Sequence, residues 1–406
     1  MTYEEFHAYL ASVSWRGSRL GLSRITELLR RMGDPQKSLR CIHVAGTNGK
    51  GSTCAMLSHI LCAAGYKVGL HTSPYVNEFA ERFQINNTPI GDAALLCAME
   101  TVKAHAEQMA DRPTEFELLC AVSLLWFARE NCDYVVIEVG MGGRLDATNV
   151  IDTPLLAVIT AMGFDHTASL GNTMREIATE KAGIIKPGGT VVIYGENAEA
   201  ETVFAEVCAA RGAVLYKTDF SLYDSEKYTL GLQGAYQRKN AALVLQCVAI
   251  LRDKGISIPE EAVVRGLAQT RWPARFETLH ANPTVILDGG HNPHGVQAAL
   301  ASLLAGYPNR KYHFVIGLMA DKDIDGMLAP LAPHAVAMYA IATDYPRALC
   351  AATLADRMRR YCENVLCAES VEAGVRLAMD AAGKDGVVCV IGSLYMAGEV
   401  RRLFGK

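Results

Sequence analysis

The segment from Gly46 to Thr53 reads Gly-Thr-Asn-Gly-Lys-Gly-Ser-Thr, a pattern suited to binding phosphate. Its glycines allow backbone amides to wrap a polyphosphate, and Lys50 can reach the outer phosphates. A hydroxyl from Ser52 or Thr53 can coordinate Mg²⁺. The usual P-loop places the hydroxyl residue directly after the lysine, whereas Gly51 intervenes here, so a structural glycine-rich turn is the alternative. The candidate nucleotide ligands in this loop are Thr47, Asn48, Gly49, Lys50, Gly51, Ser52 and Thr53.

Two further candidates follow apolar runs of the same half of the chain. Glu138 lies near the end of the run 133–139 and precedes the glycine-rich turn 140–143. A carboxylate at the carboxyl end of a strand is poorly explained as core, so we favour a magnesium ligand over a cap. His166 follows the run 155–160 in the same way. A lone histidine is more often structural, and Mg²⁺ prefers oxygen ligands.

Five more residues could take part in binding or catalysis, and for some of them a simpler structural role is the alternative. Lys181 falls in a predicted helix, 174–182, where a solvated lysine paired with a neighbouring acid is the simplest interpretation. Asn240 near the start of the helix 237–254 would suit a helix cap. Asp288 and His291 follow the apolar run 284–287, and Arg275 could donate to a phosphate or form a surface salt bridge.

The elements that must position these residues alternate between short β-branched runs and longer segments of helical period. Such alternation predicts an α/β fold with parallel sheets. The first series of predicted strands is 41–44, 134–139, 155–160 and 190–194, and the second is 284–288, 312–316, 335–342 and 387–391. We therefore predict a P-loop domain over 1–272 and a smaller Rossmann-like α/β domain over 283–406. With Asp288 and Glu138 both at strand ends, we expect the two domains to present these ends to one ATP.

The loop resembles that of the dihydrofolate synthase and folylpolyglutamate synthase family, relatives of the Mur ligases. The resemblance continues through blocks that span both predicted domains. These blocks are 72–75, 81–83, 138–149, 165–166, 180–185, 275–277 and 288–293. Tyr236 stands where family members often have histidine.

The resemblance implies roles for particular residues. It implies Mg²⁺ ligands at Ser52, Ser73, Glu138 and His166, and a carbamylated lysine at Lys181. Asn240 would contact adenine, Arg275 a phosphate, and Asp288 and His291 the ribose and nearby phosphate. Lys50, Lys181 and His291 would be the catalytic residues. Thr114, Phe116 and Glu117 resemble the pterin-side motif, although Thr114 with Glu117 three residues later would also begin an ordinary helix.

The resemblance implies an ATP-dependent ligase that phosphorylates a carboxylate and lets the amine of L-glutamate attack the acyl phosphate. The folate substrate would be tetrahydrofolate and, in the bifunctional interpretation that we favour, also dihydropteroate. A Mur-type ligase acting on a cell-wall nucleotide peptide is the main alternative. A P-loop kinase or regulatory NTPase would leave the block 288–293 unexplained, and a non-catalytic folate-binding protein would not need the nucleotide and metal residues that are present.

The composition of the chain limits the kinds of partner that we expect. The formal net charge of −4 over 406 residues offers no basic field for nucleic acid. No apolar run approaches the ~20 residues that cross a bilayer, and the acidic start lacks the features of a secretory signal. The 12 cysteines contain no CxxC pair, which favours reduced thiols. We therefore expect a cytoplasmic protein, and the resemblance implies a monomer.

Overall fold

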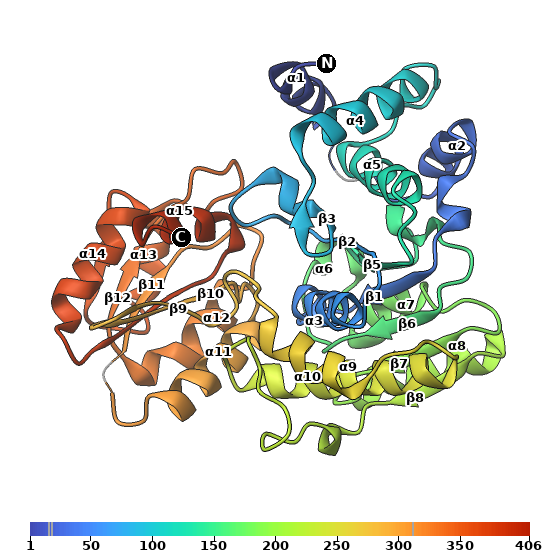
Figure 1. The fold of residues 1–406 in the computed structure, drawn as a ribbon. Helices are drawn as coiled ribbons and strands as arrows, with labels where there is room; N and C mark the ends of the chain where they lie inside the picture. The colour runs from blue at the N-terminus through green and yellow to red at the C-terminus, as the bar shows by residue number, and fades with distance from the viewer. Residues whose placement is uncertain (15–16, 18, 311) are drawn as a thin grey trace. The chain divides into compact units, whose positions relative to one another are not determined.

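The computed structural model describes residues 1–14, 17, 19–310 and 312–406. The chain forms two compact units, and each consists of two separate stretches of sequence. The first unit is Met1–Thr229 with Asn240–Thr270, and the second is Leu230–Lys239 with Arg271–Lys406. Each unit holds helices around a largely parallel sheet, which confirms the predicted α/β class (Figure 1).

The first unit is built on an eight-stranded sheet in the order β4-β3-β2-β5-β1-β6-β7-β8. Its strands are β1 (Cys41–Ala45), β2 (Val68–His71), β3 (Phe83–Ile85), β4 (Thr88–Pro89), β5 (Tyr134–Glu138), β6 (Leu156–Ile159), β7 (Thr190–Ile193) and β8 (Val214–Lys217). All neighbours pair in parallel except β2 with β3 and β3 with β4, so one edge of the sheet is antiparallel. The parallel strands therefore end at a common edge, where their following loops meet.

Helices cover this sheet. They are α1 (Tyr3–Ser14), α2 (Ser23–Arg31), α3 (Lys50–Ala63), α4 (Asp92–Ala106), α5 (Glu115–Arg129), α6 (Thr167–Leu170), α7 (Met174–Ala182), α8 (Ala198–Arg211), α9 (Tyr236–Asp253) and α10 (Glu260–Gln269). Buried residues of α1, α2, α4 and α5 form one hydrophobic core with Val135 and Ile137 of β5. Those of α7 and α8 form another with β6 and β7. These cores hold the strands that carry the candidate residues.

The second unit has a six-stranded sheet in the order β13-β12-β11-β14-β10-β9, parallel except for β9. Its strands are β9 (Glu277–Ala281), β10 (Thr284–Asp288), β11 (Tyr312–Ile316), β12 (Ala335–Ala340), β13 (Val365–Cys367) and β14 (Val387–Ile391). Its helices are α11 (Pro293–Gly306), α12 (Ile324–Leu331), α13 (Ala351–Met358), α14 (Val371–Ala382) and α15 (Ala397–Leu403). The segment 230–239 is tied to this unit because Thr278 Oγ1 donates to Gln233 Oε1 (2.7 Å) and the Ala235 amide donates to Ser302 Oγ (2.9 Å).

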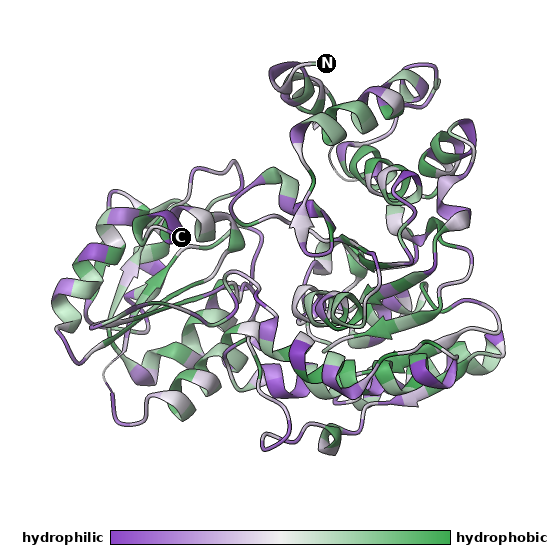
Figure 2. Cartoon of the chain, viewed as in Figure 1, coloured by the Kyte–Doolittle hydropathy of each residue, from purple (hydrophilic) through white to green (hydrophobic). Residues whose placement is uncertain are grey.

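Hydrophobic residues concentrate in the central strands of each sheet, and polar residues colour much of the outer helical surface (Figure 2). Every residue of β1, β5, β11 and β14 is buried. Such strands are typical of sheets covered on both faces. Within the described part of the chain, no helix has both the length and the apolar character needed to cross a membrane.

Candidate functional site

The phosphate loop joins β1 to α3, as predicted, and two of its glycines have backbone conformations that other residues rarely adopt. Gly46 has φ 142° and Gly49 has φ 89°. A Cβ on Gly46 would lie 1.9 Å from Thr160 Oγ1, so only glycine fits against β6's end. The amides of Thr47 and Asn48 both donate to the Ala161 carbonyl, at 3.0 and 3.1 Å. The loop is therefore held in one shape by the strand end beside it.

The first turn of α3 presents a cation and hydroxyl groups next to this loop. Lys50 Nζ donates to the carbonyls of Gly46 (3.2 Å) and Thr47 (3.1 Å). Ser52 and Thr53 are fully buried, and Thr53 Oγ1 has no hydrogen-bond partner among the described residues. A helix N-terminus, a lysine and a buried hydroxyl thus surround the loop, an arrangement suited to anionic phosphate and its metal.

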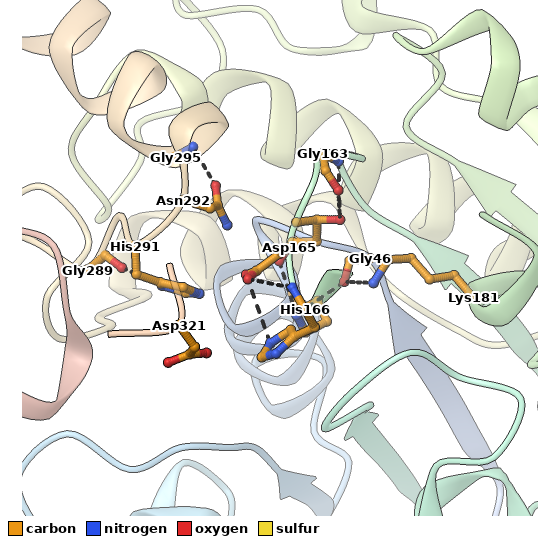
Figure 3. A network of polar contacts seen from close by, with 12 residues as sticks. Gly46, Gly163, Asp165, His166, Lys181, Gly289, His291, Asn292, Gly295 and Asp321 are labelled. Carbon is orange, nitrogen blue, oxygen red and sulfur yellow. Dashed lines mark hydrogen bonds and ion pairs between the residues drawn. The ribbon is translucent and has the colours of Figure 1, made fainter. Parts of the chain in front are cut away.

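Lys181, on α7, is not the solvated lysine of the simple interpretation. It is only 4% exposed, and its Nζ donates to the Gly46 carbonyl at 2.8 Å. Figure 3 shows its side chain extended toward that carbonyl. Burial, and then the nearby charge of Lys50, lower the pKa of Lys181 to about 7. A substantial neutral fraction at neutral pH makes this amine a nucleophile.

Two predicted metal ligands, Glu138 and His166, follow β5 and β6, the strands on either side of β1. Glu138 closes β5 and is 5% exposed, and its Oε2 accepts from the Ser73 amide at 3.1 Å. His166 has left-handed φ 51° and lies in the turn after β6, where its amide donates to Asp165 Oδ1 at 2.8 Å (Figure 3). Among the described residues, no group of three or more His, Cys, Asp or Glu could hold a metal ion. Any metal here would need hydroxyl ligands such as Ser52 and Ser73 as well as the carboxylate.

Asn240 also lies against the phosphate loop. It is in α9, is 3% exposed, and its Oδ1 would be only 2.8 Å from a Cβ built on Gly49. The structure thus brings Asn240, Gly49, Lys50 and Lys181 to one loop. Asn240 lies in the interior of α9, so the alternative of a helix cap at its start is wrong.

The predicted pterin-side motif begins α5. Thr114 is its N-cap, and Thr114 with Glu117 forms a capping box, as the simple interpretation expected. Glu117 Oε2 also accepts from Arg24 Nε at 3.0 Å, so this carboxylate is held by charge as well. Phe116 remains partly exposed, and its ring lies so close to Gly140 that a Cβ there would be 2.5 Å away. Of the three, Phe116 is the one whose side chain the helix start does not use.

In the second unit, Asp288, His291 and Arg275 gather around the turn after β10. Asp288 is buried and accepts from Tyr236 Oη (2.7 Å), the Phe276 amide (2.9 Å) and the Gly290 amide (2.8 Å). Burial raises its pKa, although these hydrogen bonds oppose the shift. His291 Nδ1 lies 2.8 Å from the Gly289 carbonyl (Figure 3). A Cβ on Gly289 would be 2.5 Å from Arg275 Nη1, so this guanidinium lies against the same turn.

Three polar residues near these sites were not singled out from the sequence. His43 in β1 is fully buried, Thr148 is its hydrogen-bond partner, and Asp146 accepts from Thr148. A histidine within an apolar strand gives no signal of its own. The block 138–149 did contain Asp146 and Thr148, but their pairing with His43 depends on a contact 105 residues away.

Two protein-family models match separate parts of the chain. Residues 44–221 match the Mur ligase middle domain, and residues 274–394 match the Mur ligase glutamate ligase domain. The dihydrofolate synthase/folylpolyglutamate synthase of Bacillus subtilis (strain 168) is 36% identical over 431 residues, covering 98% of this chain and 99% of that protein.

Solved structures of folate enzymes are similar to this chain over its full length. The Mycobacterium tuberculosis folylpolyglutamate synthase complexed with ADP superposes with a TM-score of 0.91 at 30% identity, covering 99% of this chain and 98% of that one. A bifunctional folylpolyglutamate synthase/dihydrofolate synthase with Mn, AMPPNP and L-glutamate bound gives a TM-score of 0.86 at 30% identity, covering 99% and 98%. Similarity over the full length to folate enzymes argues against the alternative of a ligase for cell-wall peptides. The chain belongs to the dihydrofolate synthase/folylpolyglutamate synthase family.

Proposed function

We propose that this chain is an ATP-dependent ligase that joins the amine of L-glutamate to a carboxylate of a folate. The observation that supports it most is the phosphate loop, where Lys50 and Lys181 donate to one carbonyl and Asn240 lies alongside. This loop is built for a nucleotide, and the relatives of known function include enzymes holding ADP, AMPPNP, Mn and L-glutamate.

In this proposal, the loop 47–53 binds the polyphosphate of ATP through its amides, and Lys50 neutralises the outer phosphates. Ser52, Ser73, Glu138 and His166 would hold a divalent cation, Mg²⁺ in our prediction. The cation lowers the repulsion between the folate carboxylate and the triphosphate. The buried hydroxyl of Thr53, which has no hydrogen-bond partner among the described residues, could donate to a phosphate oxygen, and the carboxylate of Glu138 suits a hard divalent cation.

The reaction then has two bond-forming steps. A carboxylate oxygen of the folate attacks the terminal phosphorus of ATP, and ADP leaves. The glutamate amine attacks the acyl carbon, phosphate leaves, and the amine loses its proton as the amide forms. The protein positions these groups and stabilises charge, so no side-chain nucleophile is needed.

We infer that Lys181 is carbamylated in the active enzyme. Its neutral amine would attack CO₂, forming an N–C bond and releasing a proton, and the product is an anion. In its ammonium form, Lys181 would share the Gly46 carbonyl with the cation of Lys50, which is electrostatically unfavourable in a buried site. Carbamylation would replace this repulsion with attraction to Lys50. Lys50, Lys181 and His291 are the residues we propose to act in catalysis.

On the substrate side, we propose that the pterin ring packs on Phe116, whose position is fixed by the Thr114–Glu117 capping box. In the second unit, we propose Arg275, Asp288 and His291 as nucleotide ligands. The buried Asp288 accepts three hydrogen bonds from its own chain, which supports a role in shaping the turn that presents His291. We also expect the active species to be a monomer, which light scattering would test.

The decisive experiment is ATP-dependent incorporation of labelled glutamate by the purified protein, with dihydropteroate and with tetrahydrofolate in parallel and with Mg²⁺ omitted as a control. We expect incorporation into both substrates. Incorporation into only one would make the enzyme a specialist, and none with either would overturn the proposed function. Phosphate release that depends on both folate and glutamate separates a ligase from a P-loop NTPase or a folate-binding protein.

A further inference from the structure

His43 is a fully buried imidazole in β1, three residues before the phosphate loop begins at Gly46. Its Nε2 lies 2.8 Å from Thr148 Oγ1. Its Nδ1 is buried and has no hydrogen-bond partner in the described part of the chain. Burying a polar ring in a sheet costs free energy. The one hydrogen bond that His43 keeps offsets part of this cost, so its partner indicates why the ring is there.

The direction of that hydrogen bond follows from the partners of Thr148. Thr148 Oγ1 donates to Asp146 Oδ1 at 2.6 Å, and the Thr148 amide donates to the same oxygen at 3.0 Å. The other oxygen of Asp146 accepts from the Met141 amide at 2.9 Å. Because the hydroxyl has one proton and gives it to Asp146, it must accept from His43. His43 therefore carries a proton on Nε2, and burial, which lowers the pKa of this imidazole to about 3, keeps the ring neutral.

This chain of hydrogen bonds ends on the turn that follows Glu138. Asp146 is the N-cap of the short helix Ala147–Val150. Through the Met141 amide it also holds the beginning of the turn, residues 140–146. Gly140 at the start of the turn lies against the ring of Phe116. The turn thus separates the proposed metal ligand Glu138 from the proposed pterin contact Phe116.

We propose that His43 is a positioning residue for the folate substrate: through Thr148 and Asp146, it holds the turn 140–146 against Phe116. This inference rests on the proposed function. His43 itself contacts neither the proposed ATP ligands nor Phe116 through a hydrogen bond among those described, and it acts through the geometry of the turn.

The fold supplies a matched control in a second buried imidazole. His71 in β2 and His43 in β1 are both paired with Ile137 of β5, on its two sides, so they lie on the same face of the sheet. His71 Nδ1 is 2.7 Å from Ser123 Oγ, which lies on α5 and also donates to the Leu119 carbonyl. This hydrogen bond is as short and as buried as that of His43, but it ends on Ser123, about two helical turns along α5 from Phe116, and not on the turn 140–146. Because the His71 ring lies 6.2 Å from the Phe116 ring, the control replaces Ser123 and leaves His71 in place.

The test compares His43→Leu, His43→Gln and Thr148→Val with Ser123→Ala in the full-length protein. Leucine removes the donor, whereas the glutamine amide keeps a nitrogen near the place of Nε2. We expect His43→Leu and Thr148→Val each to raise the KM for the folate substrate about tenfold with the KM for glutamate unchanged. His43→Gln should recover most of the loss. The double variant His43→Leu/Thr148→Val should be no worse than the worse single variant.

Ser123→Ala should lower the thermal stability about as much as Thr148→Val does. It should leave the KM for folate and the KM for glutamate unchanged. If His43→Leu and Thr148→Val lose stability only, and the folate KM stays at the wild-type value, the proposal is overturned. If His43→Leu does not fold, His43→Gln and Thr148→Val decide the question in the same way. An inactive wild-type protein would instead refute the proposed function, so the two failures are distinguishable.

Discussion

Lys181 and Lys50 both donate to the carbonyl of Gly46, so two lysine amines share one acceptor in a buried place. No local sequence pattern indicates that these two lysines meet. Lys181 follows an acid on a short helix, which is the usual setting of a solvated lysine. Its burial arises because α7 packs on the first sheet and brings it to a loop 135 residues earlier.

The first prediction concerns stability and pH. The folded-state pKa of Lys181, about 7, lies below its ordinary value of 10.5. Between these values the unfolded chain binds a proton that the folded chain lacks, so wild-type stability should rise with pH in this window. Methionine does not titrate. We expect Lys181→Met to be more stable than wild type by an amount that is largest below pH 7 and shrinks toward pH 10.

Urea unfolding at pH 6, 7.5 and 9 in CO₂-free buffer measures this difference, with a slope of up to ~1.4 kcal/mol per pH unit within the window. Lys254→Met, at an exposed position, provides the background. A difference that does not change with pH would show that the Lys181 amine does not titrate in this range.

The second prediction tests carbamylation. Lys181→Ala leaves room at a site that we propose to hold an anion, so a small carboxylic acid such as acetate or formate should restore part of the lost turnover. The measurement is the ligase rate against acid concentration at constant ionic strength and pH. Equal stimulation of wild type and variant would mean that the acid does not replace the carbamate.

The third prediction concerns Glu138. Glu138→Gln keeps an oxygen that can accept from the Ser73 amide but removes the charge. We expect the Mg²⁺ concentration for half-maximal activity to rise by about tenfold or more, because an amide is a weaker ligand than a carboxylate. Titration of Mg²⁺ at saturating ATP measures it, and an unchanged curve would move the metal site elsewhere.

At the scale of elements, the buried parallel strands were predictable because they are continuous apolar runs. The predicted run 41–44 is β1 and 134–139 is β5, each within a residue. The sequence did not reveal β3, β4 and β13, which are short strands at or next to a sheet edge. Few residues share their pairing, and no long apolar run marks them. The capping box of α5 was recognisable because Thr114 and Glu117 have the required spacing.

Only part of the candidate site was predictable from apolar runs in this way. Residues at strand ends, such as Glu138 and Asp288, stand out because a carboxylate after an apolar run needs an explanation. The partnership of His43 with Thr148 depends on tertiary packing between strands and turns, which no local pattern encodes. The resemblance supplied roles for residues such as Ser73 and Asn240 whose types alone are unremarkable.

The fourth prediction separates the role of a glycine from its backbone strain. Gly49 (φ 89°) and Gly65 (φ 96°) flank α3 with similar conformations. A Cβ would meet Asn240 Oδ1 at 2.8 Å in Gly49→Ala but nothing within 4 Å in Gly65→Ala. Both should lose about 1 kcal/mol of stability. Only Gly49→Ala should raise the KM for ATP by about tenfold or more.

Thermal unfolding and initial rates against ATP give both quantities. An equal ATP KM in the two variants would contradict a nucleotide at this loop. A normal KM in Gly49→Ala with a large loss of stability would assign the glycine to folding alone.

At the scale of the molecule, α9 belongs to both compact units, because its first residues, through Lys239, pack with the second unit and the remainder with the first. The fifth prediction tests this attachment. Tyr236→Phe removes the hydrogen bond to the buried Asp288 and should destabilise the protein by ~1–3 kcal/mol. Tyr236→His keeps a ring N–H that could donate to Asp288 and should cost less. Urea unfolding measures both, and an unaffected Tyr236→Phe would show that the segment is held by other contacts.

The chain passes from the first unit to the second twice, at 229/230 and again at 270/271. A fragment that starts at Arg271 would therefore lack part of its own fold: Ser302, Asp288 and Thr278 would lose the partners that residues 233–236 provide. During synthesis, residues 233–236 leave the ribosome well before the strands and helix that they contact. The second unit should consequently not be obtainable as an autonomous C-terminal piece, and joining residues 230–239 to it through a circularly permuted chain would be the way to isolate it.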